Sequence, residues 1–289
     1  MKSSQGIVTM RNKTQKHALS GEVVRKTAFL LILLTVVAVE IWYRLCDSPD
    51  EFISDCYNSA LRFCGALAAL VFMLEFSFGK ILNPLGNKRL KTFIFVLPAL
   101  AVAINNFPWV SFFMGDCTLD ADVSELLFYA IICICVGLFE EFAFRGCVLM
   151  LFLKKRRTTR QGVFMAIFWS SVIFGAVHLV NIFVSSPGAV FLQIGYSALI
   201  GALCSMVLLE TGNIWICVIV HALYNFAGGV VPRLGDGVIW TAPEVAVTAV
   251  LGVLAAIISV WRFFKLPLER TEELFIKTNK NEKEKDDNI

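Results

Sequence analysis

Charged residues are scarce in this chain of 289 residues. Asp, Glu, Lys and Arg together make up 17% of it, whereas hydrophobic residues make up 57%. Soluble domains carry about a quarter charged residues and are less than half apolar, so a soluble core and its surface do not account for this composition. The net charge of +3 is small and gives no support to nucleic-acid binding. The sequence predicts an all-α, polytopic membrane protein with no nucleic-acid partner.

Several well-known catalytic motifs are also missing. The chain has no H-E-x-x-H motif, no G-x-S-x-G elbow and no pair of aspartates inside an apolar run. It has no zinc-type cysteine spacing either, because Cys133 and Cys135 are two residues apart and point to different faces of a helix. These absences remove the most easily recognised zinc, serine and aspartyl hydrolase sites.

Long apolar runs are what the chain does have. A membrane-spanning helix needs about 20 mostly apolar residues, and the sequence offers about eight such runs. They cover residues 27–45, 59–79, 92–114, 124–153, 162–184, 189–210, 213–230 and 244–264. The third run is the weakest, because Pro98, Asn105, Asn106 and Pro108 interrupt it. We therefore expect a bundle of about eight transmembrane helices.

The loops between these runs alternate in charge. Lysine and arginine gather in the N-terminal tail and at 80–91 and 154–160, whereas acidic residues gather at 47–55 and 116–122. The positive-inside rule then places both termini in the cytoplasm. We expect a multi-pass protein of a bacterial cell membrane, in three parts. These are a cytoplasmic tail at 1–26, a transmembrane bundle at 27–264 and a charged cytoplasmic tail at 265–289.

The segment LFEEFAFRG places three charged residues in the middle of the fourth run. Ionisable residues at membrane depth are costly and usually functional. Glu141 and Arg145 are four residues apart, so they share a helix face and can pair. Glu140 is turned by about 100° from Glu141, which leaves it available as a general base or acid. The alternative is a buried ion pair that only locks helices together.

Two of the three histidines also lie inside apolar runs. Phe174 precedes His178 by four residues, so its ring can pack on the same helix face. Asn225 follows His221 by four residues, and its amide can stabilise an oxyanion. The alternative for this second pair is an interhelical hydrogen bond, worth about 1 kcal/mol.

Other polar positions have structural interpretations. Glu40, Arg62 and Glu75 lie near the ends of their runs and are expected to be interfacial or paired charges. A strip of small residues at four-residue spacing is expected to let helices pack closely: Ser197, Gly201 and Ser205.

Together, the polar segments resemble the CPBP family, the CAAX protease and bacteriocin-processing intramembrane proteases. The family pattern is E-E-x-x-x-R, then F-x-x-x-H, then H-x-x-x-N. In this chain the resemblance covers roughly residues 124–230. The matching residues, in order, are Glu140, Glu141, Arg145, Phe174, His178, His221 and Asn225.

The resemblance implies an eight-span helical fold and an intramembrane endopeptidase. It implies that Glu140 activates water with help from His178, that His221 and Asn225 stabilise the oxyanion, and that Arg145 holds Glu141. A lipid bilayer and a peptide or protein substrate are the implied partners. The chain looks bacterial, which makes a prenylated substrate less expected.

A metal is a further question for this site. Glu140, His178 and His221 could bind zinc with an open position for water. In the alternative, Glu140 and His178 deprotonate water without a metal. Asn225 favours the metal-free alternative, because a carboxamide suits an oxyanion better than zinc.

Two other functions are compatible with the same residues. The chain could be a proton-coupled transporter that uses Glu140, His178 and His221 as a relay, although it shows no internal repeat. It could also be a bacteriocin-immunity or signalling protein that binds a partner in the membrane. Cleavage of labelled peptides by the purified chain, beside Glu140→Ala, separates a peptidase from both.

Overall fold

The computed structural model describes residues 51–84 and 94–275, with a few positions between 27 and 41. Within these residues, six helices are long and apolar enough to cross a membrane. They are α2 (Glu51–Glu75), α5 (Val123–Glu141) continued by the π-helix η3 (Phe142–Leu149) and α6 (Met150–Arg156), α7 (Arg160–Val177) continued by the 3-10 helix η4 (His178–Phe183), α8 (Pro187–Thr211), α9 (Ile214–Leu234) and α10 (Ala242–Lys265).

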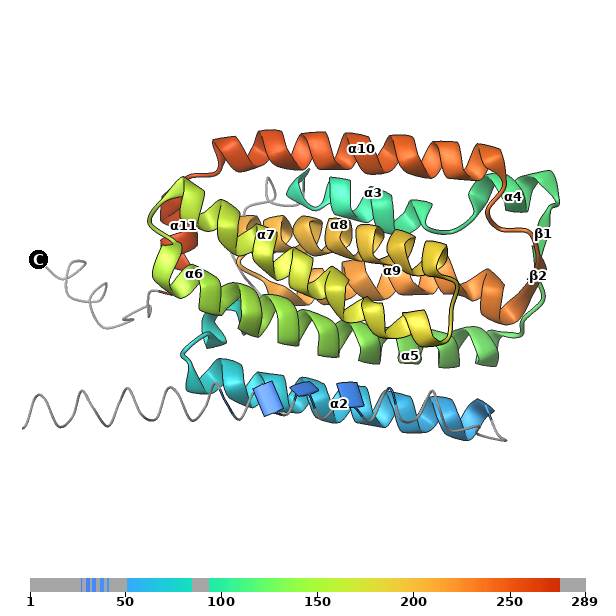
Figure 1. The fold of residues 1–289 in the computed structure, drawn as a ribbon, viewed down its shortest axis with the longest axis horizontal. Helices are drawn as coiled ribbons and strands as arrows, with labels where there is room; N and C mark the ends of the chain where they lie inside the picture. Colours follow the sequence, from blue (N-terminus) through green and yellow to red (C-terminus); the bar gives the residue numbers. More distant parts are fainter. Residues whose placement is uncertain are drawn as a thin grey trace, which may run out of the picture.

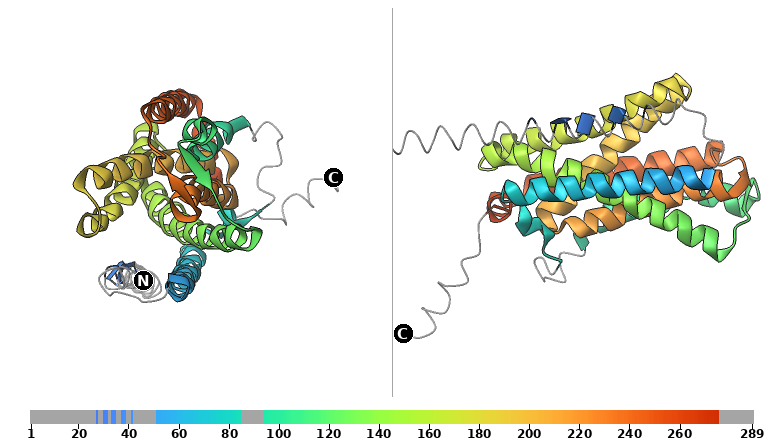
Figure 2. Two further views of the ribbon diagram at one scale, coloured as in Figure 1. Left: turned by 90° about the vertical axis from the view of Figure 1, so that its right-hand side faces the viewer. Right: turned by 90° about the horizontal axis from the view of Figure 1, so that it is seen from below.

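The remaining elements are short. They are η1 (Gly79–Leu82), α3 (Leu97–Asn105), α4 (Trp109–Met114), α11 (Leu268–Glu273) and the strands β1 (Cys117–Leu119) and β2 (Gly235–Gly237), which pair antiparallel. In Figure 1, α10 and α2 lie on opposite sides of the bundle and the other long helices lie between them. The end-on view of Figure 2 shows the same arrangement. The strands close one end of the bundle, and α6 and α11 lie at the other.

Local sequence explains where several helices begin and end. Asp122 accepts a hydrogen bond from the Glu125 amide, and Glu125 returns one to the Asp122 amide, which forms a capping box at the start of α5. The Thr159 hydroxyl caps α7 in a similar way. Gly212 ends α8 with φ of 65°, a left-handed conformation that favours glycine.

Six of the predicted apolar runs correspond to the six long helices. The run 92–114 does not form one helix of membrane length, because it breaks between α3 and α4 at Pro108. Proline lacks an amide donor and disfavours helical backbone in the preceding residue. The run 27–45 lies largely outside the described residues, so the structure does not test a count of eight.

A broad apolar surface on α10 identifies the environment of the bundle. Along this helix the exposed side chains are mostly aliphatic or aromatic, among them Val250, Val253, Leu254, Ile257, Trp261 and Phe264. A soluble monomer rarely exposes so large a continuous apolar patch, whereas a bilayer covers it. The chain is therefore a multi-pass membrane protein.

The end of the bundle that carries the acidic loops is closed by a buried carboxylate. Glu244, in the first turn of α10, accepts hydrogen bonds from the amides of Val110 and Ser111 at 2.7 and 3.1 Å. These are orphan amides at the start of α4, which the carboxylate satisfies. Glu244 thus fixes the short helix against α10.

The C-terminal segment differs from our expectation of a charged tail beginning at residue 265. Residues 266–275 include α11, and Leu266, Thr271 and Leu274 are buried in the bundle. The Thr271 hydroxyl also donates to the carbonyl of Arg157. The expectation failed because it rested on charge alone and ignored these apolar positions. Residues 1–26 and 276–289 lie outside the described part of the chain.

Candidate active site

The two adjacent glutamates end α5, and Arg145 lies in the π-helical segment that follows. Glu141 and Arg145 are fully buried, and Arg145 Nη1 lies 3.0 Å from Glu141 Oε1. This is the ion pair that the four-residue spacing predicts. A π-helix is rare and is frequent at functional sites, and nothing in the sequence pattern pointed to it.

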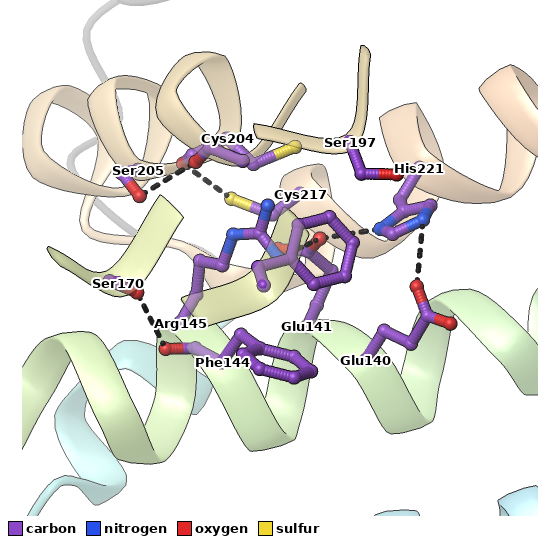
Figure 3. Close-up of polar contacts among 12 residues, drawn as sticks. Glu140, Glu141, Phe144, Arg145, Ser170, Ser197, Cys204, Ser205, Cys217 and His221 are labelled. Carbon is purple, nitrogen blue, oxygen red and sulfur yellow. Dashed lines mark hydrogen bonds and ion pairs between the residues drawn. The ribbon is translucent and has the colours of Figure 1, made fainter. Parts of the chain in front are cut away.

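His221 on α9 bridges the two glutamates. Its Nδ1 lies 2.6 Å from Glu141 Oε1, and its Nε2 lies 3.2 Å from Glu140 Oε2 (Figure 3). Ionised carboxylates only accept hydrogen bonds, so both ring nitrogens donate when His221 is an imidazolium. The four side chains then balance, because the charges of Arg145 and His221 offset those of Glu140 and Glu141.

A glycine allows this bridge to form. A Cβ on Gly137 would lie 3.0 Å from the carbonyl oxygen of Val218 and 3.2 Å from the amide nitrogen of Ala222. The backbones of α5 and α9 therefore touch one turn before Glu141, and any larger residue would push them apart. Close approach through small residues is typical of helices in membranes.

Phe174 packs the charged cluster on its apolar side. The Arg145 guanidinium carbon lies 4.4 Å from the centre of the Phe174 ring, which is a cation–π contact. The edges of His178 and His221 meet the same ring at centroid distances of 5.4 and 5.7 Å. One aromatic ring thus separates the two histidines and excludes water from Arg145.

His178 begins η4, where α7 tightens into a 3-10 helix. Its Nδ1 lies 3.1 Å from the carbonyl oxygen of Phe174. Because a carbonyl only accepts, Nδ1 carries the proton in the neutral ring, and Nε2 keeps its lone pair. Nε2 lies 3.5 Å from the hydroxyl of Ser197 on α8.

A cavity of about 630 Å³ connects these groups. Glu140, His178, His221 and Asn225 all line it, so the structure brings together the four side chains that the motifs singled out. Most of the remaining lining is apolar or aromatic. Six further polar residues line the cavity, and the sequence motifs gave them no role there, although each is a polar group in or beside an apolar run: Asn106, Tyr129, Asn181, Gln193, Tyr196 and Ser197.

A comparison with protein families finds one match in the segment that carries these residues. Residues 122–227 match the model described as Type II CAAX prenyl endopeptidase Rce1-like. No curated protein and no solved structure matches the chain. The matched segment is a CAAX protease-like domain that contains all the motif residues, and the match supports a peptidase of the intramembrane endopeptidase class.

The residues of this domain leave one nitrogen of each histidine for a metal. Nδ1 of His221 faces Glu141 and Nδ1 of His178 faces a carbonyl, which are the partners that a metal-binding histidine usually has on its other nitrogen. In the described residues, no group of three His, Cys, Asp or Glu side chains is placed to hold a metal ion. A zinc ion held by the expected trio of Glu140, His178 and His221 would have to replace the contact between His221 Nε2 and Glu140.

The cavity extends beyond the motif residues. Its lining continues through Tyr129, Asn106 and Trp240 toward the end of the bundle that carries the acidic residues. Arg62 also lines it, and its expected role as an interfacial or paired charge stays a prediction. Glu40 lies outside the described residues.

Proposed function

We propose that this chain hydrolyses a peptide bond of a membrane-associated peptide or protein, with Glu140 as the base that activates water. The observation that carries the proposal is the division of labour between neighbouring carboxylates. Glu141 is fully buried between Arg145 and His221, whereas the Glu140 side chain is 20% exposed and lines the cavity. One carboxylate holds the cluster together, and the other can reach water.

The charge balance of the cluster gives a route for the proton. Glu140 takes a proton from water, and the hydroxide attacks the carbonyl carbon of the substrate. Once Glu140 is neutral, it accepts the hydrogen bond from His221 Nε2–H less strongly. The Nε2–H group can then donate to the oxyanion that forms on the substrate. The Asn225 amide supplies a second donor from the same helix. Glu140 then gives its proton to the amine as the peptide bond breaks.

His178 assists from the other side of the cavity. Its Nε2 lone pair is available because the Phe174 carbonyl holds the proton on Nδ1. It can accept a hydrogen bond from the second proton of the attacking water. The water is then oriented by two acceptors on two different helices, Glu140 on α5 and His178 at the end of α7.

We further propose that this hydrolysis needs no metal. The contact between His221 Nε2 and Glu140 supports this, since a zinc ion bound to Nε2 would have to replace it. Turnover should be unchanged after dialysis against a chelator. Loss of turnover on chelation and recovery on addition of zinc would contradict the metal-free mechanism.

We infer from the charge of the loops that the basic end of the bundle, and both termini, face the cytoplasm. The chain offers a reporter for this, because Cys56 is exposed near the acidic end, in the first turns of α2. Cys46 lies ten residues before Cys56 and could react as well, so it is first replaced by serine. In this Cys46→Ser background, a membrane-impermeant maleimide should label Cys56 from outside intact cells. Labelling only after the cells are opened would reverse the topology.

The substrate should be a hydrophobic segment presented by the membrane. The cavity is lined mainly by apolar and aromatic groups, and the matched family model takes its name from a prenyl endopeptidase. The decisive assay places the purified chain in lipid nanodiscs with quenched fluorescent peptides, one set prenylated and one set not. Cleavage should occur in at least one set, with the cut site read by mass spectrometry.

The same preparation tests the two other functions. A transporter would acidify proteoliposomes without cutting any peptide. A binding protein would retain a partner on Glu140→Gln as well as on the unmodified chain. A chain that cuts no peptide in either set would contradict the peptidase function.

A further inference from the structure

One strip of small residues on α8 serves two different purposes. Gly201 faces the charged cluster, where an added Cβ would lie 3.2 Å from Arg145 Nη2 and 3.2 Å from the Phe174 ring. Ser205 is fully buried and donates to the Gly201 carbonyl of its own helix at 2.7 Å. Gly201 and Ser205 are placed for the close packing that their spacing predicts. Ser197, the third residue of the strip, faces His178 and the cavity instead.

Ser197 lies where the strip reaches the cavity. Its side chain lines the cavity beside Glu140 and His178, yet Ser197 is only 8% exposed. Its hydroxyl faces Nε2 of His178 at 3.5 Å, whereas the Ser205 hydroxyl bonds back to its own helix (both serines are labelled in Figure 3). Hydrogen bonds of catalytic groups are often long before substrate binds and shorten in the complex.

The hydroxyl suits both protonation states of the ring. When His178 is neutral, Nε2 has a lone pair, to which Ser197 can donate before water binds and which it can share with the attacking water afterwards. When His178 carries an extra proton, Nε2–H can donate to the same oxygen, because a hydroxyl both donates and accepts. The Phe174 carbonyl does not change its role, since Nδ1 keeps its proton throughout.

We propose that Ser197 is a positioning residue for His178, which holds Nε2 toward the cavity in both protonation states of the ring. The proposal rests on the peptidase function above, in which His178 orients the attacking water. Without the hydroxyl, Nε2 loses the partner that α8 supplies, and the ring can turn about its Cβ–Cγ bond. The loss should therefore appear in the chemical step and not in substrate binding.

The test compares three variants in nanodiscs with a cleaved peptide: Ser197→Ala, Ser197→Thr and the matched control Ser205→Ala. Ser197→Ala should lower kcat by up to about tenfold, the usual effect of losing one hydrogen bond, and should change the pH dependence of kcat with little change in KM. Ser197→Thr should restore most of the activity, because it keeps the hydroxyl. Ser205→Ala should leave kcat and its pH dependence unchanged.

A spectroscopic measurement keeps the proposal separate from the proposed function. The chain has three histidines, so ¹⁵N-histidine NMR on a His17→Gln background leaves two rings to assign. The Nε2 signal of His178 should shift in Ser197→Ala and not in Ser205→Ala. An unchanged signal, or an unchanged kcat and pH profile in Ser197→Ala, would overturn the positioning role even where peptide cleavage stands. A shifted signal in a chain that cleaves nothing would support the contact and reject the peptidase function.

Discussion

Among the described residues, two buried ionic clusters can be compared, and they are built differently. In the first, Arg145, Glu141, His221 and Glu140 form a chain that ends in a cavity. The second cluster lies near the C-terminal ends of α8 and α10, where Arg262 pairs with Glu210.

Every part of the second cluster serves to hold helices together. Arg262 also donates to the Phe95 carbonyl at 2.7 Å, and its guanidinium carbon lies 4.3 Å from the centre of the Phe95 ring. Arg270 donates to the Glu210 carbonyl. Neither Arg262 nor Glu210 lines the cavity.

The difference shows that a buried charge does not by itself mark a site. In the second cluster, Arg262 holds the Glu210 carboxylate away from the cavity, so the carboxylate cannot meet water or a substrate there. The first cluster is bridged by a histidine whose two ring N–H groups can donate to different acceptors, and its outermost carboxylate lines the cavity. Four substitutions test this contrast.

The largest combined effect on activity and stability is expected from His221→Ala. Removing the bridge leaves two carboxylates facing one arginine and removes the proposed oxyanion donor, so the rate of peptide cleavage should fall by about 10²–10⁴. The melting temperature should fall as well. His178→Ala is the control, because His178 is not part of the ionic chain: it should lose activity and keep its melting temperature. Equal melting temperatures in both variants would contradict the bridge.

Glu141→Gln should be destabilising in a way that Glu140→Gln is not. Glu141 is fully buried and contacts both Arg145 and His221, and removing one member of a buried ion pair costs about 3–5 kcal/mol in soluble proteins. Glu140 is partly exposed and has room for water. Denaturant unfolding in detergent measures both variants. Equal loss of stability in the two would reject the division of labour.

Glu210→Gln should affect stability alone. Arg262 loses its ion pair but keeps the Phe95 carbonyl, so the free energy of unfolding should fall by about 1–3 kcal/mol. The kcat of the folded fraction should be unchanged, because the pair does not line the cavity. A fall in kcat without a fall in stability would make this second cluster part of the reaction.

Gly137→Ala should have the smallest effect. The new methyl group meets the backbone of α9 at Val218 and Ala222, so the two helices must separate by a few tenths of an ångström. The bridge from Glu141 to His221 lengthens, and kcat should fall by less than about tenfold. Gly195→Ala is the control, since no atom lies within 4 Å of an added Cβ there. It should leave kcat unchanged.

Much of this arrangement could be predicted from the sequence. Four-residue spacing predicted the Glu141–Arg145 pair, and polar groups inside separate apolar runs pointed to the four side chains that line the cavity. Both arguments depend only on helix periodicity and on the cost of burying polar groups in a membrane. The catalytic roles of these residues remain predictions.

Contacts between helices could not be predicted in this way. The bridge by His221 depends on how deeply α9 packs against α5, which the close approach at Gly137 decides. The pair of Glu210 and Arg262 joins residues 52 positions apart, and spacing within one helix carries no information about it. Ser197 resembled its neighbours Gly201 and Ser205 in sequence, and only the place where α8 meets the cavity separates them.

The most direct test of the account is the rate of peptide cleavage by Glu140→Gln, measured beside Glu210→Gln in the same nanodiscs. Both changes remove one carboxylate charge from the bundle interior. The account predicts that Glu140→Gln abolishes cleavage while its melting temperature stays near that of the unmodified chain. It predicts that Glu210→Gln melts lower and still cleaves at the unmodified rate once corrected for folded protein. Substantial cleavage by well-folded Glu140→Gln would contradict the claim that this carboxylate activates the water.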